Sequence, residues 1–104
     1  MGWSPPPSIA DVPQYAVPTN GGTTVVTPGV TLLFLDAAGT VATHTITFPT
    51  GAINGQRLII TTASNLTATT LNGATVRGGV STLLANTFAH YSYSSNANAW
   101  FRTG

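Results

Sequence analysis

The sequence predicts an all-β fold: a single small antiparallel β-sandwich or barrel of about eight short strands, with an extended Pro-rich N-terminal arm. The 104 residues include 19 Thr but no Lys or Glu. Thr is β-branched and favours strands, whereas Lys and Glu are among the better helix formers. From residue 23 onward apolar and polar residues alternate with a period of two, which indicates strands with one buried face. Turn signals recur about every 8–12 residues, a spacing typical of sandwiches and barrels.

Residues 1–22 are expected to form an extended arm that precedes a β domain of residues 23–104. Pro fixes φ and removes a backbone donor, so a Pro-rich segment favours extended backbone and cannot be a central strand. The segment is interpreted either as a disordered leader or as an arm that anchors the chain on a partner protein. The candidate anchor residues are Trp3, Pro5, Pro6, Pro7, Ile9, Val12 and Tyr15.

The strands of the β domain are predicted from their local patterns. Residues 41–48 alternate strictly, with Thr43, Thr45 and Thr47 on the polar face and His44 on the apolar one. Residues 66–71 and 88–93 alternate in the same way, while the short apolar run 58–60 is typical of a strand covered on both faces.

Turn residues separate these segments. Asp36-Ala37-Ala38-Gly39 divides strands near 30–36 and 41–48, and Asn72-Gly73 predicts a two-residue type I′ hairpin turn. A loose Thr-x-Thr-x-x-x-Gly-Ala pattern starts at Thr45 and again at Thr67. Two copies do not establish a solenoid, for which three or more repeats are needed. We therefore interpret them as two strand-plus-turn units of one sheet.

The charge of the chain excludes several classes of partner. Only five residues carry a formal charge and the net charge is +1, so there is no electropositive surface for nucleic acid and no polybasic segment for membranes. We expect no nucleic acid partner and no membrane insertion. With no Cys, disulfides and thiolate metal sites are impossible.

Catalysis and metal binding are not expected either. The only carboxylates are Asp11 and Asp36, and Asp36 is placed where Asp commonly caps a turn. No nucleophile elbow, phosphate loop or dinucleotide motif occurs. His44 and His90 are too few for a zinc site, unless a three-fold axis brought copies of one His together. We therefore predict a protein that is not an enzyme and has no cofactor, with His44 partly buried and hydrogen-bonded to a neighbour.

The aromatic residues near the C-terminus have two interpretations. Tyr91, Tyr93 and Trp100 could form a surface for a glycan or a protein partner, because Tyr and Trp combine apolar rings with polar groups. Alternatively, Trp100 and Phe101 close the core in the last strand. Arg57 and Arg77 are expected at strand ends, bonded to backbone carbonyls.

The segment from Thr43 to Arg102 resembles the β-structured modules of bacteriophage virion fibre and capsid decoration (head-fibre) proteins. The resemblance lies in the order of its elements: residues 45–49, the turn and strand of residues 54–60, the Thr-rich stretch through Asn72-Gly73, the Gly78-Gly79 turn, and the closing segment from Tyr91 to Trp100.

The resemblance implies a virion structural protein: a homotrimeric capsid decoration or short head-fibre protein that attaches to a capsid or tail protein through its N-terminal arm. The scarcity of charge agrees with this, since it lowers both repulsion and desolvation cost when copies associate. The alternative is a tail-fibre receptor-binding or carbohydrate-binding β module, whose partner would be a host-surface glycan.

Overall fold

The computed structural model describes residues 11–104. The candidate anchors Trp3, Pro5, Pro6, Pro7 and Ile9 lie outside the described residues. The described part is all-β, as predicted, and it contains no helix, hence none that is long and apolar enough to cross a membrane. Its nine strands are β1 (Pro13–Ala16), β2 (Gly22–Val25), β3 (Leu32–Leu35), β4 (Val41–Thr47), β5 (Arg57–Thr62), β6 (Leu66–Asn72), β7 (Val76–Arg77), β8 (Thr87–Ser94) and β9 (Ala99–Arg102).

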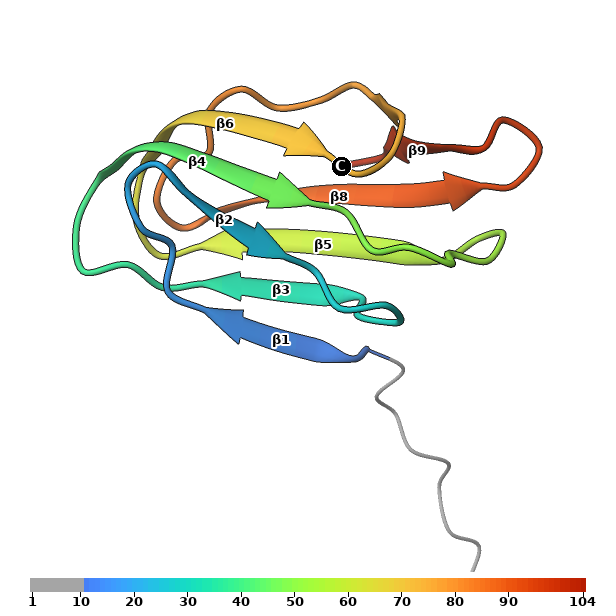
Figure 1. Ribbon diagram of the computed structural model, residues 1–104, viewed down its shortest axis with the longest axis horizontal. Coiled ribbons are helices and arrows are strands. Elements are labelled where there is room, and N and C mark those ends of the chain that lie inside the picture. The colour runs from blue at the N-terminus through green and yellow to red at the C-terminus, as the bar shows by residue number, and fades with distance from the viewer. Residues whose placement is uncertain (1–10) are drawn as a thin grey trace, which may run out of the picture.

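The strands form two sheets that face each other, and the first six strands alternate between them (Figure 1). β1, β3 and β5 lie side by side in a six-stranded sheet of order β1-β3-β5-β8-β9-β7, while β2, β4 and β6 form a three-stranded sheet. All neighbours among these six strands are parallel. The chain therefore winds like a β-solenoid of three coils, each with one strand in each sheet.

The predicted antiparallel sandwich or barrel is therefore wrong in its finer detail. Antiparallel pairing is confined to β5 with β8 and β8 with β9 among the described strands. A period-two pattern reports that a strand has one buried face, but not the direction of its neighbours. In a solenoid one face of each strand still points inward and the other outward, so the sequence alternates as it would in an antiparallel sandwich.

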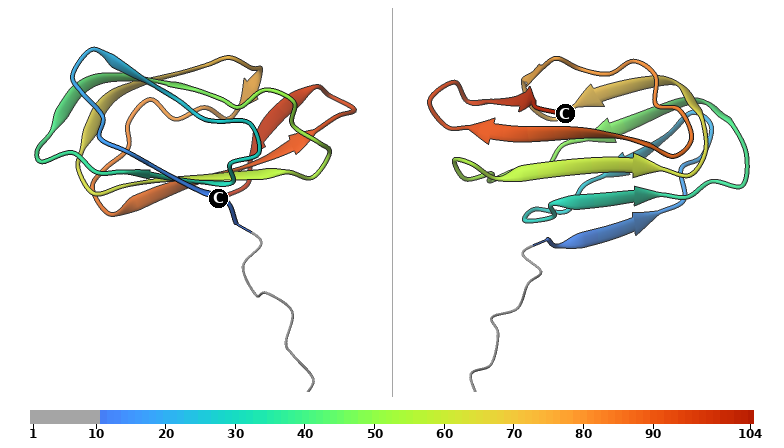
Figure 2. Two further views of the ribbon diagram at one scale, coloured as in Figure 1. Left: turned by 60° about the horizontal axis from the view of Figure 1, so that its bottom comes forward. Right: turned by 180° about the vertical axis from the view of Figure 1, so that it is seen from behind.

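The C-terminal part closes one side of the solenoid. β8 runs antiparallel to β5 and turns back into β9, and β7 adds to β9 as a parallel edge strand (Figure 2). The segment before β8 covers the free edge of β6, where the N–H and C=O of Leu66 bond to the C=O and N–H of Leu83. The edge of the three-stranded sheet is thus shielded at β6.

Asn72-Gly73 does not make the predicted hairpin. β6 ends at Asn72, and the next strand, β7, pairs with β9 in the other sheet. Gly73 has a φ of 82°, but Asn72 does not have the positive φ that a type I′ turn requires. A Cβ on Gly73 would lie 2.7 Å from a methyl carbon of Thr47, so the glycine allows a tight corner between sheets.

β4 and β6 belong to one sheet, as predicted from the repeated Thr pattern, and they are neighbours in it. The pairing, however, does not follow that pattern, because Thr45 lies beside Thr70 and not beside Thr67. Between β2 and β4, Thr23 lies beside Thr45. The chain therefore takes a longer path from β4 to β6 than from β2 to β4. Unequal coil lengths explain why a fixed-period search does not find the solenoid.

Part of the expected arm belongs to the sheet. β1 begins at Pro13 and is the edge strand beside β3, with Tyr15 opposite Phe34. The Asp11 carboxylate and the Val12 backbone also bond to Thr31. An edge position suits this Pro-containing segment, since Pro cannot donate to the ladder of a central strand.

The core lies between the two sheets. Leu33, Leu35, Leu58 and Ile60 point inward from the six-stranded sheet, and side chains such as Ile46 meet them from the opposite one. Phe48 packs edge-on against Tyr91 and Trp100, with ring centroids 5.3 and 5.4 Å away. These aromatic contacts join the three-coil part to β8 and β9.

Candidate functional site

His44 is a structural residue, as predicted. It is 3% exposed, its Nδ1 lies 2.9 Å from the carbonyl oxygen of Thr19, and its Nε2 lies 2.7 Å from Oγ1 of Thr24. A carbonyl only accepts, so Nδ1 carries the proton and Nε2 accepts the Thr24 hydroxyl. Both nitrogens are used inside one chain, so copies of His44 cannot meet on a three-fold axis to bind a metal.

No group of three or more His, Asp or Glu side chains that could hold a metal ion occurs among residues 11–104. His90 is half-buried, and its Nδ1 lies 2.8 Å from Oγ1 of Thr103. Asp11 forms an ion pair with Arg57, with 3.2 Å between Oδ1 and Nη2. The prediction that Arg57 bonds to a carbonyl is therefore wrong, because the chain folds Asp11 from the N-terminal segment against it. Arg57 and Arg77 do lie at strand ends, as expected.

Tyr91, Tyr93 and Trp100 do not form an exposed surface. Tyr91 and Trp100 are fully buried, and Tyr93 is half-buried. Because alternate residues of a strand share a face, Tyr91 and Tyr93 both point inward from β8, and Trp100 lies opposite Tyr93 on β9. Burial raises the pKa of the Tyr91 hydroxyl above its ordinary value, and the charge of Arg102 offsets only part of this increase. The core interpretation is confirmed for Trp100, whereas Phe101 is 39% exposed.

The exposed aromatic residues are instead on the outer face of the six-stranded sheet. Tyr15, Phe34, Thr61 and Phe88 are register partners on β1, β3, β5 and β8. Directly opposite residues point to the same side of a sheet, with neighbouring strands about 4.8 Å apart. The three aromatic rings are 64%, 40% and 57% exposed in chain order. They form a row across four strands.

A second row runs beside the first. Pro13, Leu32, Ile59 and His90 are register partners on the same four strands and point to the same side. We call these two rows together the aromatic face. None of its eight residues is an aspartate, glutamate, lysine or arginine. The strands concerned lie side by side in the rear view (Figure 2).

Asp36 lies at one end of the aromatic face. The Tyr15 hydroxyl donates a hydrogen bond of 2.8 Å to Oδ2 of Asp36. This hydrogen bond, together with slight burial and the negative charge of Asp36, raises the pKa of Tyr15. A shallow hollow of about 340 Å³ lies here, lined by Tyr15, Phe34, Asp36 and Asn86 among others.

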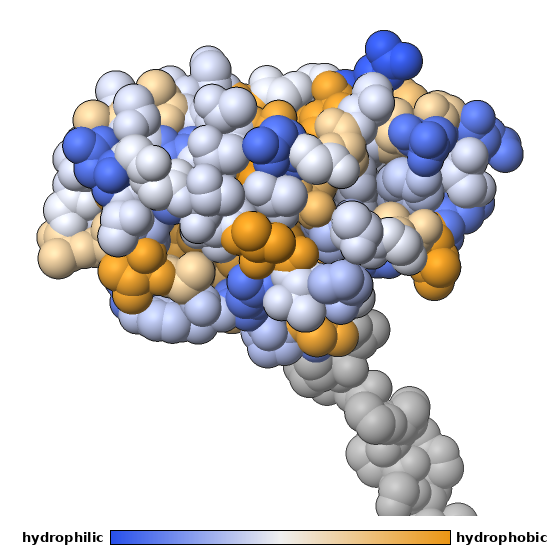
Figure 3. Space-filling view, viewed as in Figure 1, coloured by the Kyte–Doolittle hydropathy of each residue, from blue (hydrophilic) through white to orange (hydrophobic). Residues whose placement is uncertain are grey.

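The outer face of the three-stranded sheet has a different composition. Its middle row is formed by the register partners Thr23, Thr45 and Thr70. In the next row Thr47 lies between Val25, which is 61% exposed, and Asn72, to which it bonds at 2.7 Å. We call this the threonine face. Figure 3 views the molecule from this side, and the surface over β2, β4 and β6 is mostly of intermediate hydropathy.

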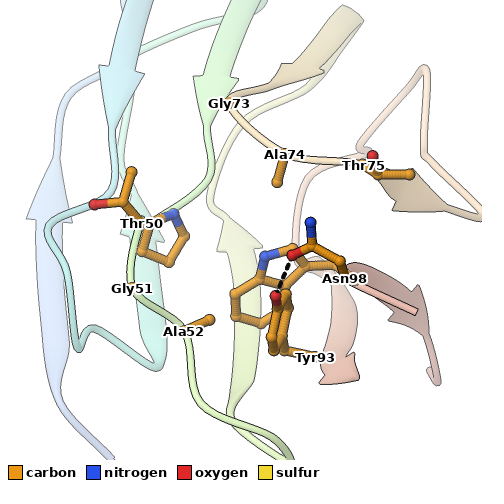
Figure 4. A pocket seen from close by; sticks show the side chains of 10 residues that line it. Thr50, Gly51, Ala52, Gly73, Ala74, Thr75, Tyr93 and Asn98 are labelled. Atoms are coloured by element: carbon orange, nitrogen blue, oxygen red, sulfur yellow. Dashed lines mark hydrogen bonds between the residues drawn. The ribbon is translucent and has the colours of Figure 1, made fainter. Parts of the chain in front are cut away.

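A polar pocket of about 510 Å³ lies at the end of the molecule where β8 turns into β9. Two loops, residues 49–52 and 73–75, form opposite walls, and Tyr93, Asn98 and Trp100 complete it (Figure 4). The Tyr93 hydroxyl donates a 2.6 Å hydrogen bond to Oδ1 of Asn98. We call this the loop pocket. It contains two of the three aromatic residues that the sequence singled out, as inner walls and not as a surface row.

Sequence reasoning missed Phe34 and Phe88. The signal was available in Leu32-Leu33-Phe34-Leu35, since a strand cannot turn four consecutive apolar side chains to one side. Leu33 and Leu35 are buried, so Leu32 and Phe34 must face outward. Four consecutive apolar residues in one strand therefore predict that two of them lie on the outer face of the sheet.

No protein-family model and no curated protein matches this chain. Among solved structures, one described as a chaperone–substrate complex contains a similar chain, with a TM-score of 0.54 and 19% sequence identity over 89% of the present chain. The match covers 17% of that much longer chain. At this identity the likeness concerns the fold alone.

Proposed function

We propose that this protein is a structural component of a bacteriophage particle: a homotrimeric capsid decoration or short head-fibre protein. On this proposal it is not an enzyme, and it attaches to a capsid or tail protein through its N-terminal arm. The observation that carries the proposal is the aromatic face, which is where copies of the chain would pack against one another.

The composition of the aromatic face supports self-association. Exposed apolar patches rimmed by polar residues on small proteins commonly mark interaction sites, and aromatic side chains are enriched at interface cores. Charged residues are depleted from such cores because they must be desolvated there. Asp11 and Arg57 at the rim already neutralise each other as an ion pair.

The small size of the domain supports it further. A chain of about 100 residues buries a smaller share of its surface than a larger domain and gains correspondingly from association. The core between the two sheets does not use Tyr15, Phe34 or Phe88, whose rings remain available for a contact between copies. On this proposal, residues 1–10, which precede β1 in the chain, attach to the particle.

Self-association is tested by measuring the absolute mass with light scattering behind a sizing column. The trimer is expected at three times the chain mass of 10.7 kDa. Phe34→Lys places a charge in the middle of the aromatic face and is expected to give a monomer. Thr45→Lys, the matched change on the threonine face, is expected to keep the trimer. A monomeric wild type, or equal effects of the two changes, would contradict the proposed interface.

Attachment is tested with particles of the phage that encodes the chain. The full chain is expected to bind particles that lack it. A chain without residues 1–10 is expected to remain a trimer but to lose binding to these particles. Retained binding by the shortened chain would show that the arm is not the anchor.

A further inference from the structure

Charged side chains are so few in this chain that each one can be accounted for. There are five, and all lie in the part of the chain that the structure describes. Asp11 and Arg57 form an ion pair, and no other ion pair occurs among the described residues. One aspartate, Asp36, and two arginines, Arg77 and Arg102, therefore have no oppositely charged side chain beside them within one chain.

Arg77 points to the same side of the six-stranded sheet as the aromatic face. A third row of register partners runs beside the two rows of that face. Its members are Arg57, Ser92, Phe101 and Arg77. Because alternate residues of a strand share a side, Arg57 points to the same side as Ile59, and the rest of the row follows. Arg102 comes directly after Phe101 and therefore points to the other side.

Asp36 lies near the opposite edge of this sheet, in a hollow with aromatic walls. Its carboxylate and the rings of Tyr15 and Phe34 line the shallow hollow of about 340 Å³ at the end of the aromatic face. We call it the Asp36 hollow. Oδ2 of Asp36 accepts from the Tyr15 hydroxyl, and carboxylate oxygens have lone pairs for further donors. The hollow therefore combines a negative charge with two exposed aromatic rings.

The backbone around the Asp36 hollow is held by the fold. The Asp36 N–H bonds to the Ala16 carbonyl at 3.0 Å, which joins the end of β3 to β1. The Ala63 N–H bonds to the Leu35 carbonyl at 2.9 Å, which joins the end of β5 to β3. The Tyr15 hydroxyl holds the carboxylate itself. The shape of the hollow and the position of its charge are thus set without an occupant.

An arginine side chain matches this combination of groups. A guanidinium carries a permanent positive charge, donates two parallel N–H groups to a carboxylate and stacks its planar face on aromatic rings. An anionic occupant would be repelled by Asp36, and an apolar one would cover the carboxylate without pairing it, which is costly. The chain contains no Lys, so a cationic side chain supplied by a second copy is an arginine.

Within one chain the charges of Asp36 and Arg77 are too far apart to meet. Asp36 follows β3, and Arg77 is on β7, four positions further across the sheet. At about 4.8 Å between neighbouring strands, this separation is about 19 Å. In the rear view β1 and β3 lie on one side of the sheet and β9 on the other (Figure 2). Arg77 can therefore reach an Asp36 hollow only on another copy.

We propose that the Asp36 hollow receives the Arg77 side chain of a neighbouring copy. This inference rests on the proposed function, since it names residues that join the copies of the trimer. A contact between two different patches is heterologous, and such contacts close into a ring when the rotation from copy to copy closes. A trimer then contains three of these contacts, one at each boundary between copies.

The test reverses the two charges separately and together. Light scattering behind a sizing column, over a range of loading concentrations, gives the concentration at which half of the trimer dissociates. Asp36→Arg and Arg77→Asp are each expected to raise this concentration at least about tenfold, because like charges then meet at every boundary. The double variant pairs the two positions again with exchanged charges and is expected to associate more tightly than either single variant. If it does not, the proposal is overturned.

A second double variant controls for net charge. Asp36→Arg combined with Arg102→Asp has the same net charge as the wild type and the first double variant, but its new carboxylate points to the other side of the sheet. It is expected to associate as weakly as Asp36→Arg alone. Recovery equal to that of the first double variant would show that net charge alone controls association, and would overturn the proposal.

A milder variant separates the charge of Asp36 from its bond to Tyr15. Asp36→Asn keeps an acceptor for the Tyr15 hydroxyl and removes the charge, so it is expected to weaken association about threefold to tenfold. A trimeric wild type that neither this change nor the charge reversals weaken would overturn the contact and leave self-association intact. A monomeric wild type would instead contradict self-association itself, and this contact with it.

Discussion

The outer faces of the two sheets differ although their backbones are alike. Both sheets carry rows of directly opposed side chains, yet one row is Tyr15, Phe34, Thr61 and Phe88, the last on the antiparallel strand β8, and the other is Thr23, Thr45 and Thr70. The fold needs neither set, because the core is formed by the inward residues of both sheets. The difference between the two faces is therefore not required by the core.

Their interactions with solvent differ correspondingly. Each threonine hydroxyl can bond to water or to a neighbour, as Thr47 does to Asn72, so the threonine rows are solvated without any charge, and Val25 is the exposed apolar residue beside them. Phe34 and Phe88 have no polar group on their exposed rings, so moving these rings out of water would be favourable. On the proposed function, the aromatic face is the one that contacts other copies of the chain, while the threonine face stays in water.

The largest expected effect separates inward from outward aromatic residues. Phe48→Ala removes a 1% exposed ring that packs on Tyr91 and Trp100, and it is expected to lower the free energy of unfolding by about 3–5 kcal/mol. Phe88→Ala removes a 57% exposed ring of the aromatic face and is expected to change it by about 0.5 kcal/mol or less.

Both changes are compared by urea unfolding in the Phe34→Lys background, which is expected to be monomeric, so that association does not contribute to the stability. If Phe48→Ala does not fold, Phe48→Leu provides a milder core change. A loss for Phe88→Ala as large as that for Phe48→Ala would mean that the aromatic face supports the fold itself.

A smaller loss of stability is expected when a threonine hydroxyl is removed from the buried side of β2, and a smaller one still when it is removed from the outer side. Thr24→Val removes the hydroxyl that donates to Nε2 of His44 and leaves that nitrogen buried without a donor, at a cost of about 1–3 kcal/mol. Thr23→Val, one residue earlier on the threonine face, is expected to cost about 0.5 kcal/mol or less. Urea midpoints measure both, and indistinguishable losses would argue against the assigned His44 tautomer.

The all-β class followed from the sequence because Thr content and period-two alternation are local properties. His44 could also be interpreted correctly, since its place on the apolar face beside Ile46 and Phe48 required a polar partner inside the chain. The parallel direction of the strands could not be predicted, because alternation is identical for parallel coils and antiparallel hairpins when one face of each strand is outward.

The site residues were harder to predict for a related reason. Tyr91 and Trp100 have the same residue types whether they lie in a core or on a surface, and only the pairing of β8 with β5 and β9 decides which side they face. Asp11 and Arg57 lie far apart in the chain and meet only because β1 and β5 flank β3 in one sheet. Contacts across coils have no local signal.

The smallest effect concerns a single proton at the end of the aromatic face. The Asp36 carboxylate accepts from Tyr15 and raises its pKa above the ordinary value of about 10. The neutral phenol is the form that donates, so the stabilisation is complete below the unfolded pKa and is lost as the pH rises through the higher folded pKa. Asp36→Asn keeps an acceptor but removes the charge, and the midpoint of Tyr15 is expected to fall. Ring signals of Tyr15 followed by NMR against pH give this midpoint, with Tyr15→Phe to assign them. An unchanged midpoint would show that the Asp36 carboxylate does not bond to the Tyr15 hydroxyl in solution, and that the Tyr15 side chain, like Phe88, has no hydrogen bond to fix it on the aromatic face.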